Sequence, residues 1–322
     1  MSPILSVRGL TVCYPNADQP AVDGVGFDLE PGATIAVVGE SGSGKSTVAL
    51  ALSRLLNPAV SIRADALTFE GQDLLGLRRE ALRRLRARRI AMIFQSPFGS
   101  WNPSRTIGAQ LVDGLRAAGL WPDRRERLLE LLKRVGLDDP ERRLGDYPHR
   151  FSGGMLQRAM IAGALVTEPS LLVADEPTSA LDATVQAEIL EILDELRKEQ
   201  NLALMLISHD LGVVARVAQH TLVLYRGQVV ESGPTAALYR HAGHPYTQGL
   251  LAAVPRLEGP RKTPLPAMPQ GTATRGGCVF ASRCPRAEDL CRTSAPSPRH
   301  LNGTNVACHF AEDVRREPIW RW

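Results

Sequence analysis

The sequence of 322 residues lacks the features that mark a membrane-spanning or secreted chain. No apolar run approaches the roughly 20 residues that a helix needs to cross a bilayer. The N-terminal residues show no basic stretch followed by a long apolar core, so we expect no secretion signal. The formal net charge of +4 is too small to indicate nucleic-acid binding by itself. No internal repeat is visible. The composition is otherwise that of an ordinary globular protein. The function must therefore be inferred from the sequence motifs.

Apolar strand-like runs alternate with helical patterns along most of the chain. This alternation predicts an α/β fold with a mostly parallel sheet covered on both faces. The composition shifts to Pro, Gly, Arg and Cys beyond Gly233-Pro234, which predicts a main domain over 1–235 and a loop-rich tail over 236–322. We expect a helical subdomain over about 97–166. The expected strands are 5–14, 21–30, 66–69, 89–94, 171–175, 202–207 and a hairpin over 221–231.

A glycine-rich segment, 39–47, fits the phosphate-binding pattern G-x-x-x-x-G-K-[ST] and follows an apolar strand-like run. Backbone N–H groups of such a loop turn inward around phosphates, and the next helix points its positive end at them. Lys45 is expected to bridge the β- and γ-phosphates, and the Ser46 hydroxyl to help hold Mg²⁺. The sequence therefore predicts a nucleoside triphosphate site. The expected contacts are Gly39, Ser41, Gly42, Ser43, Gly44, Lys45, Ser46 and Thr47.

Polar residues follow three further strand patterns. Asp175 ends an apolar strand and is expected near Mg²⁺, and Glu176 comes next, where it could lie by the attacking water. Gln95 could reach Mg²⁺ or that water, and His209 could contact the γ-phosphate. Taken singly, a Gln or His at a strand end is more often an ordinary polar side chain. Together with the phosphate loop, they predict a site for phosphoryl transfer.

A second glycine-rich segment precedes a helical run at 159–165. Ser152 is a good N-cap, and Gly153 and Gly154 would let a phosphate approach the helix N-terminus. From this segment alone, a helix start without a ligand is an equally good interpretation.

The ordered set of motifs resembles the ATP-binding subunit of ABC transporters over about the first 235 residues. The resemblance implies that Tyr14 stacks on adenine, that Glu176 is the catalytic base, and that His209 is a switch residue. It also implies a head-to-tail dimer in which the Ser152 motif acts on ATP bound by the opposite subunit. The residues that carry the resemblance are Tyr14, 39–47, Gln95, 152–154, 175–176, 179–182 and His209.

The same resemblance implies the partners and the location. They are a second ATPase subunit, two transmembrane permease subunits and an extracytoplasmic substrate-binding protein, with no nucleic acid. The chain would lie peripherally on the cytoplasmic face of the cell membrane. Residues 96–103 would meet a coupling helix of a membrane subunit. ATP hydrolysis would then power the import of a solute.

The signature segment departs from the commonest Leu-Ser-Gly-Gly-Gln form at Phe151 and Met155. Met155 cannot donate the hydrogen bonds of a glutamine, so the partner's ATP site would be weakened or changed. This variant, residues 244–251 and the Cys-bearing tail are similar to oligopeptide and dipeptide importers. The departures favour a heterodimer with a sister chain, and a homodimer stays open.

The chain has five cysteines, and an ATP site without a signal peptide points to the cytosol, where thiols stay reduced. Cys13 stands apart as a bystander. The other four lie in loop-like sequence without the paired C-x₂-C spacing of a zinc ribbon, and they suggest a structural metal site. The spacing leaves an iron–sulfur cluster, zinc and unligated thiols open, and the importer resemblance favours a 4Fe–4S cluster. The four residues are Cys278, Cys284, Cys291 and Cys308.

The most basic stretch spans 78–89 and reads as a solvated helix face with Leu82 and Leu85 turned inward. Contact with anionic lipid heads is the alternative.

Three function classes compete. The first is the energising subunit of a peptide importer, with nickel or glutathione as alternative solutes. The second is a soluble ABC-class ATPase acting on nucleic acid or ribosomes, which usually carries two nucleotide domains or a long insertion. The third, a partner without catalysis, is disfavoured because Glu176 and His209 are both present.

Overall fold

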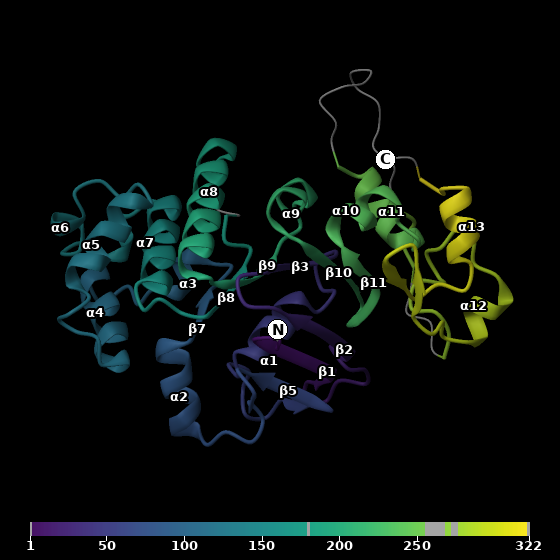
Figure 1. Cartoon of the computed structure of the whole chain (residues 1–322), viewed down its shortest axis with the longest axis horizontal. Coiled ribbons are helices and arrows are strands. Elements are labelled where there is room, and N and C mark those ends of the chain that lie inside the picture. The colour runs from purple at the N-terminus through teal and green to yellow at the C-terminus, as the bar shows by residue number, and fades with distance from the viewer. Residues whose placement is uncertain (1, 179–180, 255–267, 272–275, 321–322) are drawn as a thin grey trace.

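The protein is represented by a computed structural model that describes residues 2–178, 181–254, 268–271 and 276–320. Residues 179–180, which belong to the motif over 179–182, lie outside the described residues. Two β-sheets pack together at the centre, with helices on either side (Figure 1). The predicted α/β architecture is therefore confirmed.

The larger sheet has eight strands in the described part of the chain. In spatial order they are β12 (Arg299–Leu301), β13 (Thr304–Val306), β11 (Gln228–Pro234), β10 (His220–Tyr225), β3 (Thr34–Val38), β9 (Ala203–Ile207), β8 (Leu171–Asp175) and β7 (Ile90–Ile93). Pairing from β10 through β7 is parallel, and β11, β12 and β13 join antiparallel. Strands β3, β8 and β9 are buried at every residue, as their continuous apolar sequences predict.

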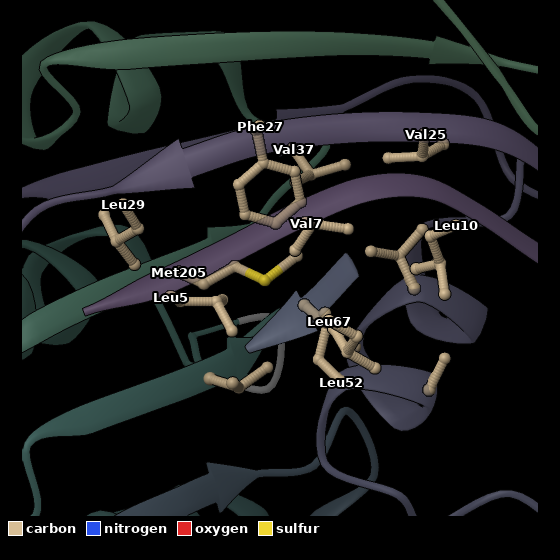
Figure 2. Packing of buried hydrophobic residues seen from close by; sticks show 14 of the residues in the cluster. Leu5, Val7, Leu10, Val25, Phe27, Leu29, Val37, Leu52, Leu67 and Met205 are labelled. Atoms are coloured by element: carbon tan, nitrogen blue, oxygen red, sulfur yellow. The ribbon is translucent and has the colours of Figure 1, made fainter. Parts of the chain in front are cut away.

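The smaller sheet is antiparallel and comes from the N-terminal part of the chain. Its strands are β2 (Val22–Leu29), β1 (Leu5–Cys13), β5 (Ala66–Phe69) and β6 (Gln72–Asp73), with β4 (Ser61–Arg63) paired to β1. Its apolar side chains face the larger sheet and helix α1 (Lys45–Leu52). Figure 2 shows Leu5 and Phe27 of this sheet beside Met205 of β9 and Val37 of β3, so one apolar core joins the two sheets.

Helices of the segment expected to form a helical subdomain lie at one end of the molecule (Figure 1). They pack on an apolar core that they share with one face of the larger sheet. The elements of this segment are α3 (Pro97–Ser100), α4 (Ile107–Ala118), α5 (Arg125–Arg134), α6 (Pro140–Arg143), the 3₁₀ turn η1 (Pro148–Arg150) and α7 (Gly153–Leu165). Helix α8 (Ala183–Gln200) packs against this core and continues to β9, and α9 (Leu211–Val217) follows β9.

Helix α2 (Arg79–Arg88) carries the arginine run. Leu82 and Leu85 are buried, whereas Arg83 and Arg84 are exposed. The expected solvated helix face is confirmed.

The region after residue 235 contains more regular structure than its composition predicts. Its helices are α10 (Thr235–Arg240), α11 (Pro245–Ala252), α12 (Asp289–Thr293) and α13 (Ala311–Arg316). The hairpin of β12 and β13 extends the larger sheet through pairing of Glu231 with Val306. Helices α12 and α13 lie at the end of the molecule opposite α4 to α6 (Figure 1). Pairing between β11 and β13, which are far apart in the sequence, gives this region its regular structure, and composition alone does not predict such pairing.

Among the described residues, no helix has both the length and the apolar character needed to cross a bilayer.

The core between the two sheets predicts a large cost for truncation at Leu5, which is 0 % exposed. Leu5→Ala should lower the free energy of unfolding by about 2–5 kcal/mol, because it leaves a cavity between closely packed layers. Urea titration followed by circular dichroism measures the loss. Leu55→Ala, at a residue 40 % exposed, is the matched control and should change the value by less than about 0.5 kcal/mol. Equal effects of the two substitutions would contradict this packing.

Candidate functional site

The carboxyl ends of four parallel strands meet at one edge of the larger sheet. Strand β3 leads into the glycine-rich loop, β7 is followed by Gln95, β8 ends at Asp175 and β9 is followed by Ser208 and His209. Ligand sites of parallel sheets form at this edge. An open pocket of about 310 Å³ lies there, and its lining consists of Ala21, Ser41, Gly42, Gly44, Lys45, Ser46, Thr47, Gln95, Glu176 and His209. The structure therefore brings most of the sequence-predicted residues together.

The glycine-rich loop needs glycine at two of its positions. Gly39 has φ 152° and Gly44 has φ 103°, values that residues with a Cβ rarely adopt. A Cβ at Gly39 would overlap the carbonyl oxygen of Leu224, and one at Gly44 would overlap that of Ala21. Both glycines thus allow the loop to lie against the neighbouring backbone before α1 begins at Lys45.

Lys45 is folded back onto the loop. Its Nζ donates hydrogen bonds to the carbonyl oxygens of Gly39 and Glu40, both at 2.8 Å, and the residue is only 7 % exposed. Burial lowers the pKa of Lys45, and the nearby carboxylates of Glu176 and Asp175 oppose that shift. The two hydrogen bonds to carbonyl oxygens keep the ammonium group inside the loop. A bound phosphate would replace these carbonyl oxygens as its partner.

Asp175 is buried at the end of β8 beside the Ser46 hydroxyl, which hydrogen bonds to its carboxylate. Burial raises the pKa of Asp175. Its Oδ1 atom is buried without a hydrogen-bond partner among the described residues. A buried carboxylate oxygen that lacks a donor suits a hard divalent cation, so the donor chemistry of Ser46 and Asp175 fits Mg²⁺.

Glu176 lies at the centre of a small polar network. Its Oε2 accepts a hydrogen bond from Nε2 of Gln95 at 2.9 Å, and its Oε1 lies 3.0 Å from Nδ1 of His209. The backbone of Glu176 has φ 48°, and its N–H donates to the carbonyl oxygen of Ile207. A positive φ at a residue with a long side chain is unusual and occurs often at functional sites. This backbone turn directs the carboxylate towards the residues that follow the neighbouring strands.

Tyr14 lies just after β1, 38 % exposed, with its hydroxyl 3.4 Å from Oγ1 of Thr47. It does not belong to the described lining of the pocket. Its ring is near the start of α1, beside the pocket.

The Ser152 motif is not part of this pocket in the described part of the chain. Ser152 caps α7, and its Oγ accepts the N–H of Met155 at 3.2 Å. Ser152 is exposed, and Met155 is half-buried against the helical core. The motif therefore presents its helix N-terminus to the outside of this subunit.

Gln157 was not predicted from the sequence as a site residue. It is 0 % exposed, and its Nε2 donates to the carbonyl oxygen of Pro177 at 2.6 Å. It thus ties α7 to the segment that follows Glu176. Helical spacing was the available signal, because Gln157 shares a face with the apolar Met160 and Ile161.

A larger groove of about 590 Å³ is lined by residues of β7 and α2 on one side and of α4 and α7 on the other. Its apolar lining includes Phe94, Trp101, Leu111 and Met160. Phe98, three residues before the lining residue Trp101, is 62 % exposed.

The four tail cysteines border a single small pocket beside α11 and α13. None of them is in a disulfide, and burial raises the pKa of Cys284 to about 11 and that of Cys308 to about 12. Among the residues that the structure describes, no group of three or more His, Cys, Asp or Glu side chains is arranged to hold a metal ion. The predicted metal at these cysteines therefore gains no support from the arrangement of the ligands. Cys13 lies apart on β1.

Comparison with protein families gives two matches. Residues 22–179 match the ABC transporter family, and residues 230–291 match the C-terminal region of oligopeptide/dipeptide transporters. Among solved structures, a dimeric ATP-binding cassette bound to ADP and phosphate in a post-hydrolysis state superposes with a TM-score of 0.63. It is 26 % identical and covers 72 % of this chain and 98 % of its own. The ATP-binding subunit of another ABC transporter is 30 % identical and superposes with a TM-score of 0.63. The match covers 74 % of this chain and 93 % of that one.

The fold and site thus define an ABC-type ATPase, the ATP-hydrolysing subunit of a transporter. More narrowly, the chain belongs to the oligopeptide/dipeptide branch of the ABC transporter ATP-binding proteins. It is 42 % identical to the dipeptide transport ATP-binding protein DppD of Haemophilus influenzae, over 98 % of both chains. Identity to DppD of Escherichia coli is also 42 %, over 98 % of this chain and 99 % of that one.

Asp175 yields a test of the proposed Mg²⁺ position. Because burial raises its pKa in the folded chain, the ionised form is disfavoured there, and the cost appears as the pH rises through the folded-state pKa. Asp175→Asn should therefore raise the melting temperature of the nucleotide-free protein at pH 7 and abolish the further increase caused by Mg²⁺-ATP. Differential scanning fluorimetry measures both shifts.

The exposed Asp123 provides the control, since Asp123→Asn should leave both shifts as in the wild type. A nucleotide-free Asp175→Asn protein that melts below the wild type would show that burial of this charge is not the dominant effect.

Proposed function

We propose that this chain is the ATPase subunit of an importer that carries dipeptides or oligopeptides across the cytoplasmic membrane. The observation that carries the proposal is the convergence of Lys45, Glu176 and His209 on one pocket, with Asp175 buried beside its Ser46. The chain is also similar along its length to proteins named for dipeptide transport. The relatives' names favour peptides over nickel or glutathione as the solute. An ATPase acting on nucleic acid or ribosomes gains no support from them.

In this proposal each group of pocket residues has a separate role in ATP hydrolysis. Residues 39–47 hold the phosphates, with Lys45 at the β- and γ-phosphates and Tyr14 against adenine. Ser46, Asp175 and Gln95 would hold Mg²⁺, which would supply charge neutralisation at the phosphates. Glu176 accepts the proton of the attacking water. His209, 3.0 Å from Glu176, orients that carboxylate and senses the γ-phosphate.

The partner's ATP is the proposed ligand of Ser152, Gly153 and Gly154. Ser152 is exposed at the start of α7, away from the pocket, which supports a head-to-tail dimer in which each subunit completes the other's site. Closure then depends on ATP, and hydrolysis reopens the dimer. Met155 stands where a glutamine is commonest and cannot donate its hydrogen bonds, which favours a second ATPase subunit of different sequence as the partner.

The apolar groove beside the helical subdomain is the proposed contact with the membrane subunits. Ser100 and Trp101 line this groove and Phe98 is exposed, so residues 96–103 would meet a coupling helix of one of the two permease subunits. The chain is accordingly placed as a peripheral protein on the cytoplasmic face of the membrane. An extracytoplasmic binding protein would deliver the solute.

We also propose two functional parts along the chain, an ATP-binding domain over 1–235 and a C-terminal region over 236–322. The family matches at 22–179 and 230–291 support this division.

The four tail cysteines are the proposed ligands of a 4Fe–4S cluster with a structural role. The support is chemical, because all four thiols border one pocket, whereas their present arrangement does not match a metal site. Because burial raises the pKa of Cys284 and Cys308, the thiolates would form only as the metal displaces their protons.

Anaerobic purification tests the cluster. The protein should contain about four iron and four acid-labile sulfide per chain, and Cys284→Ser should lose most of both. Cys13→Ser, which removes the distant thiol, is the control and should retain them. Zinc instead of iron, or metal-free protein with four reactive thiols after unfolding, would contradict the proposal.

Hydrolysis and transport are tested together with Glu176→Gln in cells that carry the complete transporter. The variant should bind ATP as the wild type does, lose turnover by at least about 100-fold, and abolish uptake of a labelled dipeptide. In the presence of ATP it should co-purify with two permeases and a second ATPase, because the closed dimer no longer reopens. Binding titration, phosphate release and mass spectrometry measure these results.

Wild-type turnover in this variant would remove Glu176 from the role of base. Retained ATPase activity with ribosomal or DNA-associated partners would overturn the transport proposal and leave the ATP site standing.

A further inference from the structure

In the part of the chain that the structure describes, hydrogen bonds from the C-terminal region reach the phosphate loop at Glu40. All three polar groups of Glu40 are engaged. Its carbonyl oxygen accepts from Lys45 Nζ at 2.8 Å, and its N–H donates to Oη of Tyr246 at 2.7 Å. Its carboxylate accepts two hydrogen bonds from the guanidinium of Arg283, at 2.6 and 2.9 Å. Two of these three contacts come from the region beyond residue 235.

Arg283 is held firmly before it meets Glu40. Its Nε donates to the carbonyl oxygen of Pro269 at 2.6 Å, and its Cζ lies 5.7 Å from the ring centre of Tyr225 and 5.8 Å from that of Phe280. Its side chain is 13 % exposed. A guanidinium fixed in this way presents both donors to a carboxylate with little loss of side-chain entropy.

Tyr246 is equally constrained. It is fully buried in α11, and its ring centre lies 4.7 Å from that of Tyr225 and 5.5 Å from that of Phe280. The packing of the ring fixes the position of the hydroxyl that accepts the Glu40 N–H. Glu40 is therefore bound to a rigid cluster of aromatic side chains.

We propose that Arg283 and Tyr246 are positioning residues for ATP binding. They act through Glu40, whose carbonyl oxygen holds Lys45, and so arrange the loop before the phosphates arrive. Arg283 also neutralises a carboxylate that would otherwise repel the phosphates a few residues along the same loop. Neither residue touches ATP. The inference rests on the assignment of residues 39–47 as the phosphate loop, and it gives the C-terminal region a direct effect on nucleotide affinity.

A double-mutant cycle on the full chain tests the proposal, with Mg²⁺-ATP as the titrant. Arg283→Gln should raise the dissociation constant and KM for ATP about threefold to tenfold and leave kcat at saturating ATP within about twofold. Glu40→Gln in that background should restore most of the affinity, because it removes the unpaired negative charge. Arg283→Lys should give an intermediate affinity.

Three further variants separate the possible outcomes. Tyr246→Phe keeps the ring packing, removes only the hydroxyl and should also weaken ATP binding. Arg286→Gln is the matched control, because Arg286 lies in the same region but pairs with Glu317, and it should leave affinity unchanged. Lys45→Ala should abolish tight binding.

The results distinguish the proposal from its premise. If Arg283→Gln lowers the melting temperature and leaves ATP affinity and KM unchanged, Arg283 is merely structural and the proposal is wrong. Failure of Glu40→Gln to restore affinity would also overturn it. Unchanged affinity in Lys45→Ala would instead remove the phosphate-loop assignment. Should Arg283→Gln fail to fold, Tyr246→Phe decides the question.

Discussion

Parallel hydrogen bonding among β3, β9, β8 and β7 is the constraint on which this structure depends. Because parallel strands point the same way, the residues that follow each strand meet at one sheet edge, although they are far apart in sequence. The loop after β3, Asp175 at the end of β8 and His209 after β9 become neighbours for this reason. The apolar core between the two sheets holds the strands in register, and so it holds the site as well.

Hydrogen bonds from both ends of the molecule reach the site in the described part of the chain. From the helical end, Gln157 of α7 bonds to Pro177, one residue beyond Glu176. From the opposite end, Arg283 and Tyr246 bond to Glu40 in the phosphate loop. Both contacts fall on segments that directly follow strands of the larger sheet. A movement of either end would therefore shift residues beside the ATP pocket through these hydrogen bonds.

Buried carboxylates have contrasting surroundings in this protein. Burial raises the pKa of Glu231 as it does that of Asp175. Glu231, however, accepts the backbone N–H groups of Gly243 and His244 at 2.8 and 3.0 Å and faces Arg315 at 3.6 Å, so it fastens the C-terminal region to β11. Asp175 has an oxygen without such a donor. The first arrangement is complete in the chain itself, whereas the second is suited to a cation from outside.

The sequence alone determined the long strands of the first 235 residues, the phosphate loop and the order of the motifs, because apolar runs and glycine spacing act over a few neighbouring residues. It located Lys45, Asp175, Glu176 and His209 and predicted their convergence. Only the tertiary structure decided that Arg283 meets Glu40, that Gln157 is buried against Pro177 and that the hairpin of β12 and β13 completes the sheet. These contacts join segments distant along the chain, and their formation depends on how whole layers pack, which no local pattern encodes.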